Sequence, residues 1–324
     1  MIRIAYYHGD DLPARDLTVG QVRAAMLDPA GTLWVDIEAP STEELDSGMV
    51  RELGLDPGIT RDSLTAGRPS AVRLIESESG AIAAARLPPA SDGDRPDGSP
   101  IAVWLAPNWL VTCRSGTDER IDALLAAVES DPWLLAEGAD RLVARLLDAT
   151  VADARRAADR LGAKAADLHR RVLERPRRRE VEQMIRTRHA ATRLDGDLDG
   201  IVDGAALLAA AASPARSANQ VYYAAVGDAA RDALEGVRRT EQLMSDVLDA
   251  HGAMEASRTR RALDRLLLVA FLALMVITYA VVGGGPAWEV LGSRYSLMSA
   301  GAGLVGVIAV VAVALLGFRW IDRR

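Results

Sequence analysis

Two long stretches without a charged side chain lie near the C-terminus of this 324-residue chain, at residues 266–288 and 295–318. Each is longer than the roughly 20 residues that a helix needs to cross a hydrocarbon core of about 30 Å. Lipid offers the backbone no hydrogen-bond partners, so both stretches are expected to be helical, and the run GGGP at 283–286 is expected to end the first helix. We therefore predict transmembrane helices at 266–286 and 295–318, an outer loop at 287–294 and a basic tail at 319–324.

Arginines flank both predicted membrane helices. Four arginines precede the first helix and three follow the second, whereas the loop carries only Glu289 and Arg294. Because clustered arginines are retained on the cytoplasmic side, both termini are expected in the cytoplasm and the loop outside. The start MIRIAYYHGDD lacks the basic and apolar regions of a signal peptide. The sequence thus predicts a multi-pass protein of the cell (inner) membrane, with the lipid bilayer as a partner.

The remaining composition argues against several other classes of protein. A single cysteine, Cys113, allows no intrachain disulfide framework, and a net charge of -7 argues against nucleic acid as a partner. The four histidines are scattered without the spacing of a zinc site. No phosphate-binding loop, nucleophile elbow or paired acid–base motif occurs. We therefore expect neither an enzyme nor an organic cofactor.

Residues 1–130 are expected to form a cytoplasmic α/β domain. Ser41 and Glu44 have the spacing of a capping box and predict a helix after the first strand. Runs of β-branched, aromatic and apolar residues predict strands at 32–38, 72–75, 81–87 and, as a hairpin turning at Pro107-Asn108, 101–114.

Helical patterns dominate from about residue 119 onwards. They predict helices at 119–130, 133–174, from about 179 to 212, and from about 217 onwards, with breaks at the arginine-rich turn 175–179 and at Ser213-Pro214. We assign 131–216 to a long helical hairpin and 217–265 to a stalk helix. No proline occurs between Pro214 and Pro286, so the stalk is expected to continue into the first membrane helix over about 100 Å. Such a helix would couple cytoplasmic rearrangements to the membrane.

The order of the predicted strands, long helices and membrane spans resembles that of the CorA-like metal-ion transporter superfamily. The resemblance rests on WVDIEAPSTEEL, RELGLDPGITRDSL and NWLVTCRSG, on the long helices, and on two C-terminal spans with a short loop. It implies an α+β fold in which an α/β/α cytoplasmic domain and long helices form the funnel of a homopentamer. It also implies a pore lined by the first span and a divalent cation, Mg²⁺ or Zn²⁺, as substrate and possible regulator.

The selectivity filter departs from the family pattern. Gly284, Gly285 and Pro286 stand where the family has Gly-Met-Asn or a close variant. The missing asparagine would have offered a carboxamide oxygen to a hydrated cation. Backbone carbonyls from Gly283 to Pro286 are the candidate replacement, and Glu289 in the outer loop is the candidate for attracting cations.

The predicted pore face is mostly apolar. By the resemblance, the family's polar pore positions fall on Arg260, Phe271 and Ile277, with Thr278 adjacent. The apolar constriction would be formed by Leu263, Leu266, Leu267, Phe271 and Leu274. Such a constriction would gate by dewetting. The alternative is that these side chains face lipid or pack between helices. Arg260 falls on the same face and would repel divalent cations unless it turns outward to Asp264 or to lipid phosphates.

Three further features of the sequence bear on cations and anions. By the resemblance, Asp249 coincides with an acidic position that helps to bind a regulatory metal; the alternative is a solvated carboxylate. The segment DGDLDG at 195–200 matches half of a calcium loop, but the expected final glutamate is Ala206 and the segment lies in a helical run. Together with Asp203, its residues Asp195, Asp197 and Asp199 lie on neighbouring turns and could collect cations or form a solvated helix face. The arginines from Arg170 to Arg179 could bind anions, bind a neighbouring subunit's carboxylates, or form a solvated tip.

Two hypotheses about function follow. In the first, several copies of the chain surround an axis, since two spans cannot enclose a pore, and conduct a divalent cation. In the second, the chain has kept the scaffold without conduction and serves as a membrane-anchored sensor or scaffold protein. The preserved architecture favours the first, whereas the missing asparagine, Arg260 and Phe271 favour the second.

Overall fold

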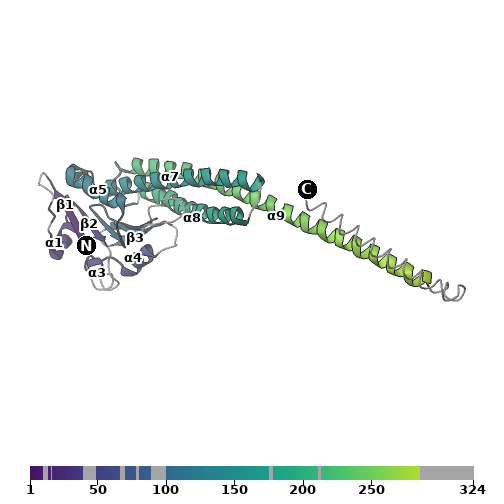
Figure 1. The fold of residues 1–324 in the computed structure, drawn as a ribbon. Coiled ribbons are helices and arrows are strands. Elements are labelled where there is room, and N and C mark those ends of the chain that lie inside the picture. Colours follow the sequence, from purple (N-terminus) through teal and green to yellow (C-terminus); the bar gives the residue numbers. More distant parts are fainter. Residues whose placement is uncertain are drawn as a thin grey trace. The chain divides into compact units, whose positions relative to one another are not determined.

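The computed structural model describes residues 1–9, 14–15, 17–38, 49–65, 70–77, 80–88, 100–174, 178–210 and 213–284 (Figure 1). The chain divides into two compact units, an N-terminal unit Met1–Val247 and a C-terminal unit Leu248–Arg324. One long helix contributes residues to both units.

A six-stranded mixed sheet forms the centre of the N-terminal unit. Its strands are β1 (Ile2–His8), β2 (Gly31–Glu38), β3 (Ala71–Ser77), β4 (Gly80–Leu87), β5 (Ile101–Leu105) and β6 (Trp109–Arg114). They follow the order β1-β2-β6-β5-β4-β3, and every neighbouring pair is antiparallel except β2 and β6. The strands predicted at 32–38, 72–75, 81–87 and 101–114 are thus confirmed, whereas β1 was not predicted.

Helices cover both faces of this sheet. One face packs against α1 (Val19–Met26), α3 (Met49–Glu52) and α4 (Pro57–Leu64) in an apolar cluster that includes Leu33, Val35 and Trp104. The other face is covered by α5 (Glu119–Ser130), α6 (Trp133–Ala136), α7 (Ala139–Glu174) and α8 (Arg178–Ala209) (Figure 1). Because side chains alternate along a strand, Trp34 and Asp36 of β2 point to this second face. The predicted α/β/α layering therefore holds.

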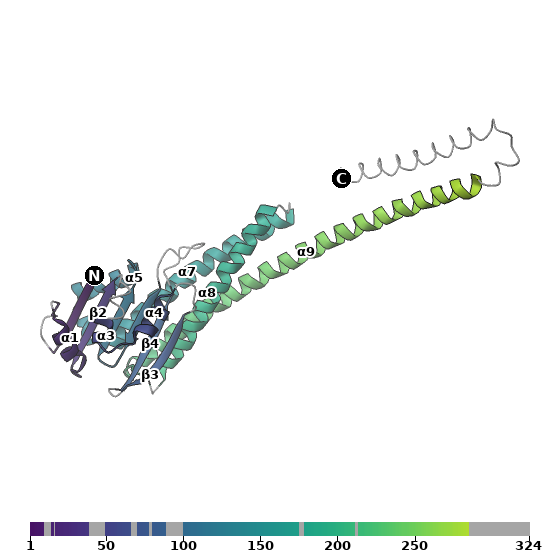
Figure 2. The ribbon, with the colours of Figure 1, turned by 90° about the horizontal axis from the view of Figure 1, so that it is seen from below.

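The helix predicted at 133–174 is interrupted. Gly138 has a φ of 109°, which L side chains rarely adopt, and it separates α6 from α7. The long helices otherwise match the prediction: α7 and α8 form the hairpin, and α9 runs unbroken over Gln220–Gly284 (Figure 2). Close approach through small residues positions α9, since a Cβ at Gly227 would lie 3.4 Å from the Cβ of Ala205 on α8.

The membrane-spanning segments remain predictions. Within the described part of the chain, no helix is long and apolar enough to cross a membrane. The helix predicted after Ser41 lies largely outside the described residues, apart from α3, and so do the outer loop, the second span and the basic tail. The proposed domain boundaries at 130, 216 and 265 are likewise untested.

Candidate functional site

The predicted pore segment is a helix with exposed apolar side chains. Leu263, Leu267, Phe271 and Leu274 of α9 are 55%, 68%, 61% and 61% exposed in the single chain. At about 100° per residue these four lie on one arc of about 80° around the helix. Leu268, also exposed, lies about 60° beyond one edge of the arc, and the exposed Leu266 and Ile277 lie about 60° and 40° beyond the other edge. Apolar side chains exposed in such numbers mark a surface that lipid or another protein chain covers.

The structure describes only some of the other predicted site residues. Gly283 and Gly284 end α9, while Gly285, Pro286 and Glu289 lie outside the described residues. Thr278 belongs to α9, and Asp249 is exposed on the same helix. Among the described residues, no group of three or more His, Cys, Asp or Glu side chains could hold a metal ion. The single chain therefore does not bring Asp249 together with further ligands from its described part.

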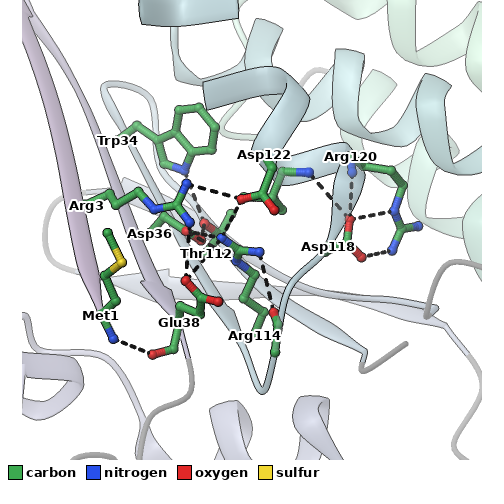
Figure 3. A network of polar contacts seen from close by, with 12 residues as sticks. Met1, Arg3, Trp34, Asp36, Glu38, Thr112, Arg114, Asp118, Arg120 and Asp122 are labelled. Atoms are coloured by element: carbon green, nitrogen blue, oxygen red, sulfur yellow. Dashed lines mark hydrogen bonds and ion pairs between the residues drawn. The ribbon is translucent and has the colours of Figure 1, made fainter. Parts of the chain in front are cut away.

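A buried ionic network, which sequence reasoning missed, lies between the sheet and α5 (Figure 3). Arg114 at the end of β6 and Asp36 on β2 both have fully buried side chains, and the guanidinium donates to Asp36 from Nε and Nη2 at 3.2 and 3.1 Å. Thr112 donates to the other oxygen of Asp36 at 2.7 Å and accepts from the indole of Trp34. The parallel pairing of β2 with β6 sets Asp36 beside Thr112 and so creates the contact.

The network continues outwards to more exposed carboxylates. Arg114 also donates to Asp122 of α5 at 2.9 Å. Arg3 of β1 bridges Asp122 and Glu38 at 3.1 and 3.2 Å. Arg114 is thus fully buried together with Asp36, whereas Arg3 joins β1 to the first turn of α5. All of these groups have partners within the protein, so the network fixes the sheet against α5 rather than presenting a reactive group.

Burial and pairing act in opposite directions on the charged groups of the network. Burial raises the pKa of Asp36 above its ordinary value, although Thr112 and Arg114 both stabilise the carboxylate. Burial disfavours the charged form of Arg114, but the neighbouring Asp36 and Asp122 more than offset this and raise its pKa. The arginine is therefore always charged, and Asp36 is the group whose protonation responds to the network.

A second buried pair caps α5. Asp118 accepts hydrogen bonds from the backbone N–H groups of Arg120 and Ile121, and its carboxylate pairs with the Arg120 guanidinium at 2.7 Å. Arg120 also donates to Thr150 of α7 and to the carbonyl of Pro88. Burial alone would raise the pKa of Asp118, but these hydrogen bonds and the charge of Arg120 lower it. The pair ties the end of β4 to α5 and α7.

The acidic segment 195–200 forms contacts within the fold and is no calcium loop. It lies within the continuous helix α8. Asp197 points towards β3 and accepts hydrogen bonds from the backbone and the hydroxyl of Ser70. Asp195 and Asp199 instead bind Arg238 of α9 at 2.9 and 3.1 Å. Three of the four carboxylates that the sequence suggested as a cation-collecting cluster therefore divide between two faces of α8, and the fourth, Asp203, is exposed.

Solved structures of other proteins share this architecture. The complete CorA magnesium transporter from Methanocaldococcus jannaschii has a TM-score of 0.65 at 12% identity, with 98% of this chain and 97% of that chain covered. The full-length CmaX protein has a TM-score of 0.59 at 17% identity, covering 99% and 97%. The ZntB cytoplasmic domain from Vibrio parahaemolyticus RIMD 2210633 has a TM-score of 0.56 at 10% identity, covering 78% and 99%. No curated protein matches the chain.

A mixed sheet covered by helices and followed by a 65-residue helix is thus the fold of CorA-type transporter proteins. The chain belongs to the family described as CorA-like Mg²⁺ transporter protein, whose profile matches residues 29–278. The resemblance seen in the sequence is confirmed. So is the expectation that the chain is not an enzyme, because the family consists of transporters. At the level of the family, the protein is a divalent-cation transporter.

Proposed function

We propose that the protein forms a homopentameric divalent-cation channel or transporter of the cell membrane, with residues 266–286 of each copy lining the pore. The observation that carries this proposal is the row of exposed apolar side chains on α9, which lies inside the part of the chain that matches the transporter family. The magnesium transporter CorA, which shares the fold, is the precedent for Mg²⁺ as cargo. ZntB suggests Zn²⁺ as the second ion to test.

A shared arc on α9 supports the assignment of the pore face. Residues 249 and 278 fall at about 40° and 60° from Leu263 at about 100° per residue, within the arc that contains Leu267, Leu274 and Phe271. Helices that surround an axis present one arc to it. An apolar ring of Leu263, Leu267 and Leu274 would close the path by dewetting, and Phe271 would narrow it. Asp249, further from the membrane on the same arc, would bind a regulatory cation together with the neighbouring copies.

The filter is proposed at the end of α9. Carbonyl oxygens of Gly283, Gly284, Gly285 and Pro286 would replace the family's asparagine as ligands of a hydrated cation. Glu289 would raise the local concentration of cations at the outer mouth.

A second candidate function is a membrane-anchored sensor or scaffold that does not conduct. It is favoured by the exposed Arg260, which also falls within the apolar arc, at about 60° from Leu263. Five guanidinium groups on the axis side would repel a divalent cation. Pro286 also favours the non-conducting function, because it offers a cation a backbone carbonyl but no carboxamide oxygen.

Flux of Mg²⁺ and Zn²⁺ into liposomes that contain the purified full-length pentamer tests the proposal. Saturable flux is expected, and Phe271→Ala is expected to increase it because the constriction widens. Leu268→Ala is the matched control, since Leu268 is 62% exposed but lies outside the arc, and it is expected to leave flux unchanged. A correctly assembled oligomer that conducts neither ion, with or without Phe271→Ala, would support the non-conducting function instead.

A further inference from the structure

Arginines gather where the α7–α8 hairpin turns. Residues 170–179 contain six arginines and a single acidic residue, Glu174, in a chain whose net charge is -7. The structure describes four of these arginines, Arg170 and Arg171 on α7 and Arg178 and Arg179 on α8, and we call these four the arginine tip. None of the proposed transport steps uses them.

Neighbouring carboxylates neutralise the arginine tip only in part. Arg170 and Arg171 share one carboxylate, Asp167, and Arg178 pairs with Glu182. The side chains remain 70%, 48% and 94% exposed, respectively, and Arg179 is exposed as well. Arg178 and Arg179 also occupy the first turn of α8, where the helix dipole favours negative charge and where Glu180 is the acidic residue. Even with Glu180 counted, the four arginines outnumber the three carboxylates of Asp167, Glu180 and Glu182. The tip therefore carries an excess of positive charge that a bound anion would neutralise.

The arginine tip lies at a defined end of the N-terminal unit. On α8 and α9, Ala205 lies beside Gly227, Asp195 pairs with Arg238, and Thr192 donates to Glu241. Residue numbers fall along α8 as they rise along α9, so the two helices are antiparallel. The start of α8 therefore lies at the end of the unit towards which α9 runs as it approaches Val247. Only 18 residues, 248–265, lie between Val247 and the start of the apolar stretch at Leu266.

We propose that the arginine tip binds the anionic phosphate headgroups of the membrane that holds residues 266–286. This inference rests on the proposed function, which puts that segment into the bilayer. Guanidinium groups bind phosphate oxygens in a bidentate manner, and clustered basic residues bind anionic membrane surfaces additively. Four exposed arginines spread over two helix ends fit a plane of headgroups better than a single small anion. The contact would hold the α7–α8 hairpin at the membrane surface.

Hydrogen–deuterium exchange of the full-length protein in nanodiscs tests the inference. Insertion into nanodiscs and resistance to alkaline extraction are established first, because failure there contradicts the proposed function itself. Amide exchange across the hairpin turn is then compared between phosphatidylcholine and phosphatidylglycerol nanodiscs, at low and at high salt. One variant replaces Arg170, Arg171, Arg178 and Arg179 with glutamine. The matched control replaces four exposed arginines elsewhere, Arg15, Arg23, Arg231 and Arg239.

Exchange at the turn is expected to be at least about tenfold slower in phosphatidylglycerol, because each arginine near an anionic surface favours association by a factor of about five. High salt and the tip variant should abolish the difference, whereas the control variant should keep it. Equal exchange in both lipids, or a difference that the tip variant retains, would overturn the inference while leaving the transport proposal intact. If inorganic phosphate slows amide exchange equally in phosphatidylcholine nanodiscs, the tip binds soluble anions. If exchange is already slow in phosphatidylcholine nanodiscs without any added anion, the tip binds a neighbouring copy. Either result would also overturn binding to lipid.

Discussion

Replacing Arg114 with methionine tests the buried network most directly. The change removes the partner of Asp36 while both side chains are fully buried, and it also removes the contact with Asp122. Asp36 would keep only the hydroxyl of Thr112. Breaking one side of a buried ion pair typically costs about 3–5 kcal/mol, because the remaining charge is left without compensation. For a unit of this size that corresponds to a fall in Tm of about 6–20 °C.

The cost of Arg114→Met should depend on pH. Asp36 already has a raised pKa in the folded protein, and loss of Arg114 removes one of the groups that lower it. The folded variant then binds a proton up to a higher pH than the unfolded chain, whose aspartate titrates near about 4. Between these two pKa values the folded state holds more protons, so stability falls as pH rises and levels off above the folded pKa. The penalty is therefore expected to be larger at about pH 8 than at about pH 5.

Urea unfolding of the detergent-solubilised protein, followed by the fluorescence of buried Trp34, Trp104 and Trp109, measures the effect on the sheet. Asp36→Asn in the Arg114→Met background should recover part of the loss, because asparagine leaves no buried charge. Arg231→Met, at a partly exposed pair with Asp228, should cost less than about 1 kcal/mol. The reasoning is refuted if Arg114→Met costs no more than Arg231→Met, or if Asp36→Asn gives no recovery.

Three further changes test other contacts. Gly200→Ala would place a Cβ onto the carbonyl of Ser70, so we expect the free energy of unfolding in urea to fall by about 1–3 kcal/mol. The matched control is Gly236→Ala, which has open space around the added Cβ and should be neutral or stabilising by up to about 1 kcal/mol. Arg238→Gln breaks the pairs with Asp195 and Asp199, but the arginine is largely exposed, so we expect only a small loss of stability in urea unfolding, smaller than that of Arg114→Met, that shrinks further at high salt. Burial and the neighbouring Asp28 carboxylate together raise the pKa of Tyr6 to about 12. Asp28→Asn should therefore lower this pKa only part of the way to its ordinary value, which a pH titration of tyrosinate absorbance would show.

The sequence predicted most elements because their local signals agree with the fold. The runs TLWVDIE and WLVTCR are strand-like, and no proline interrupts α9. β1 was missed because an edge strand with alternating exposure carries a weaker apolar signal than a strand buried on both faces, such as β2. The break at Gly138 was missed because a single glycine within a helical pattern reveals its positive φ only when the packing is known.

The buried network could not be predicted because its residues are far apart in the sequence. A charged residue inside an apolar strand, as Asp36 is in WVDIE, indicates that a partner exists. The identity of the partner depends on the parallel register of β2 and β6, which sets Asp36 beside Thr112. That pairing skips β3, β4 and β5, so no local pattern specifies it.

The segment DGDLDG shows how helix geometry can overrule a motif. In a calcium loop, alternate aspartates converge on one ion because the backbone coils around it. In a helix, a spacing of two residues means a turn of about 200°, while a spacing of four brings residues back to within about 40°. Asp197 accordingly points to Ser70, which directly precedes β3, and Asp195 and Asp199 together bind Arg238 on α9. The same three carboxylates that suggested a cation site thus connect α8 to the sheet on one side and to the helix leading to the predicted pore on the other.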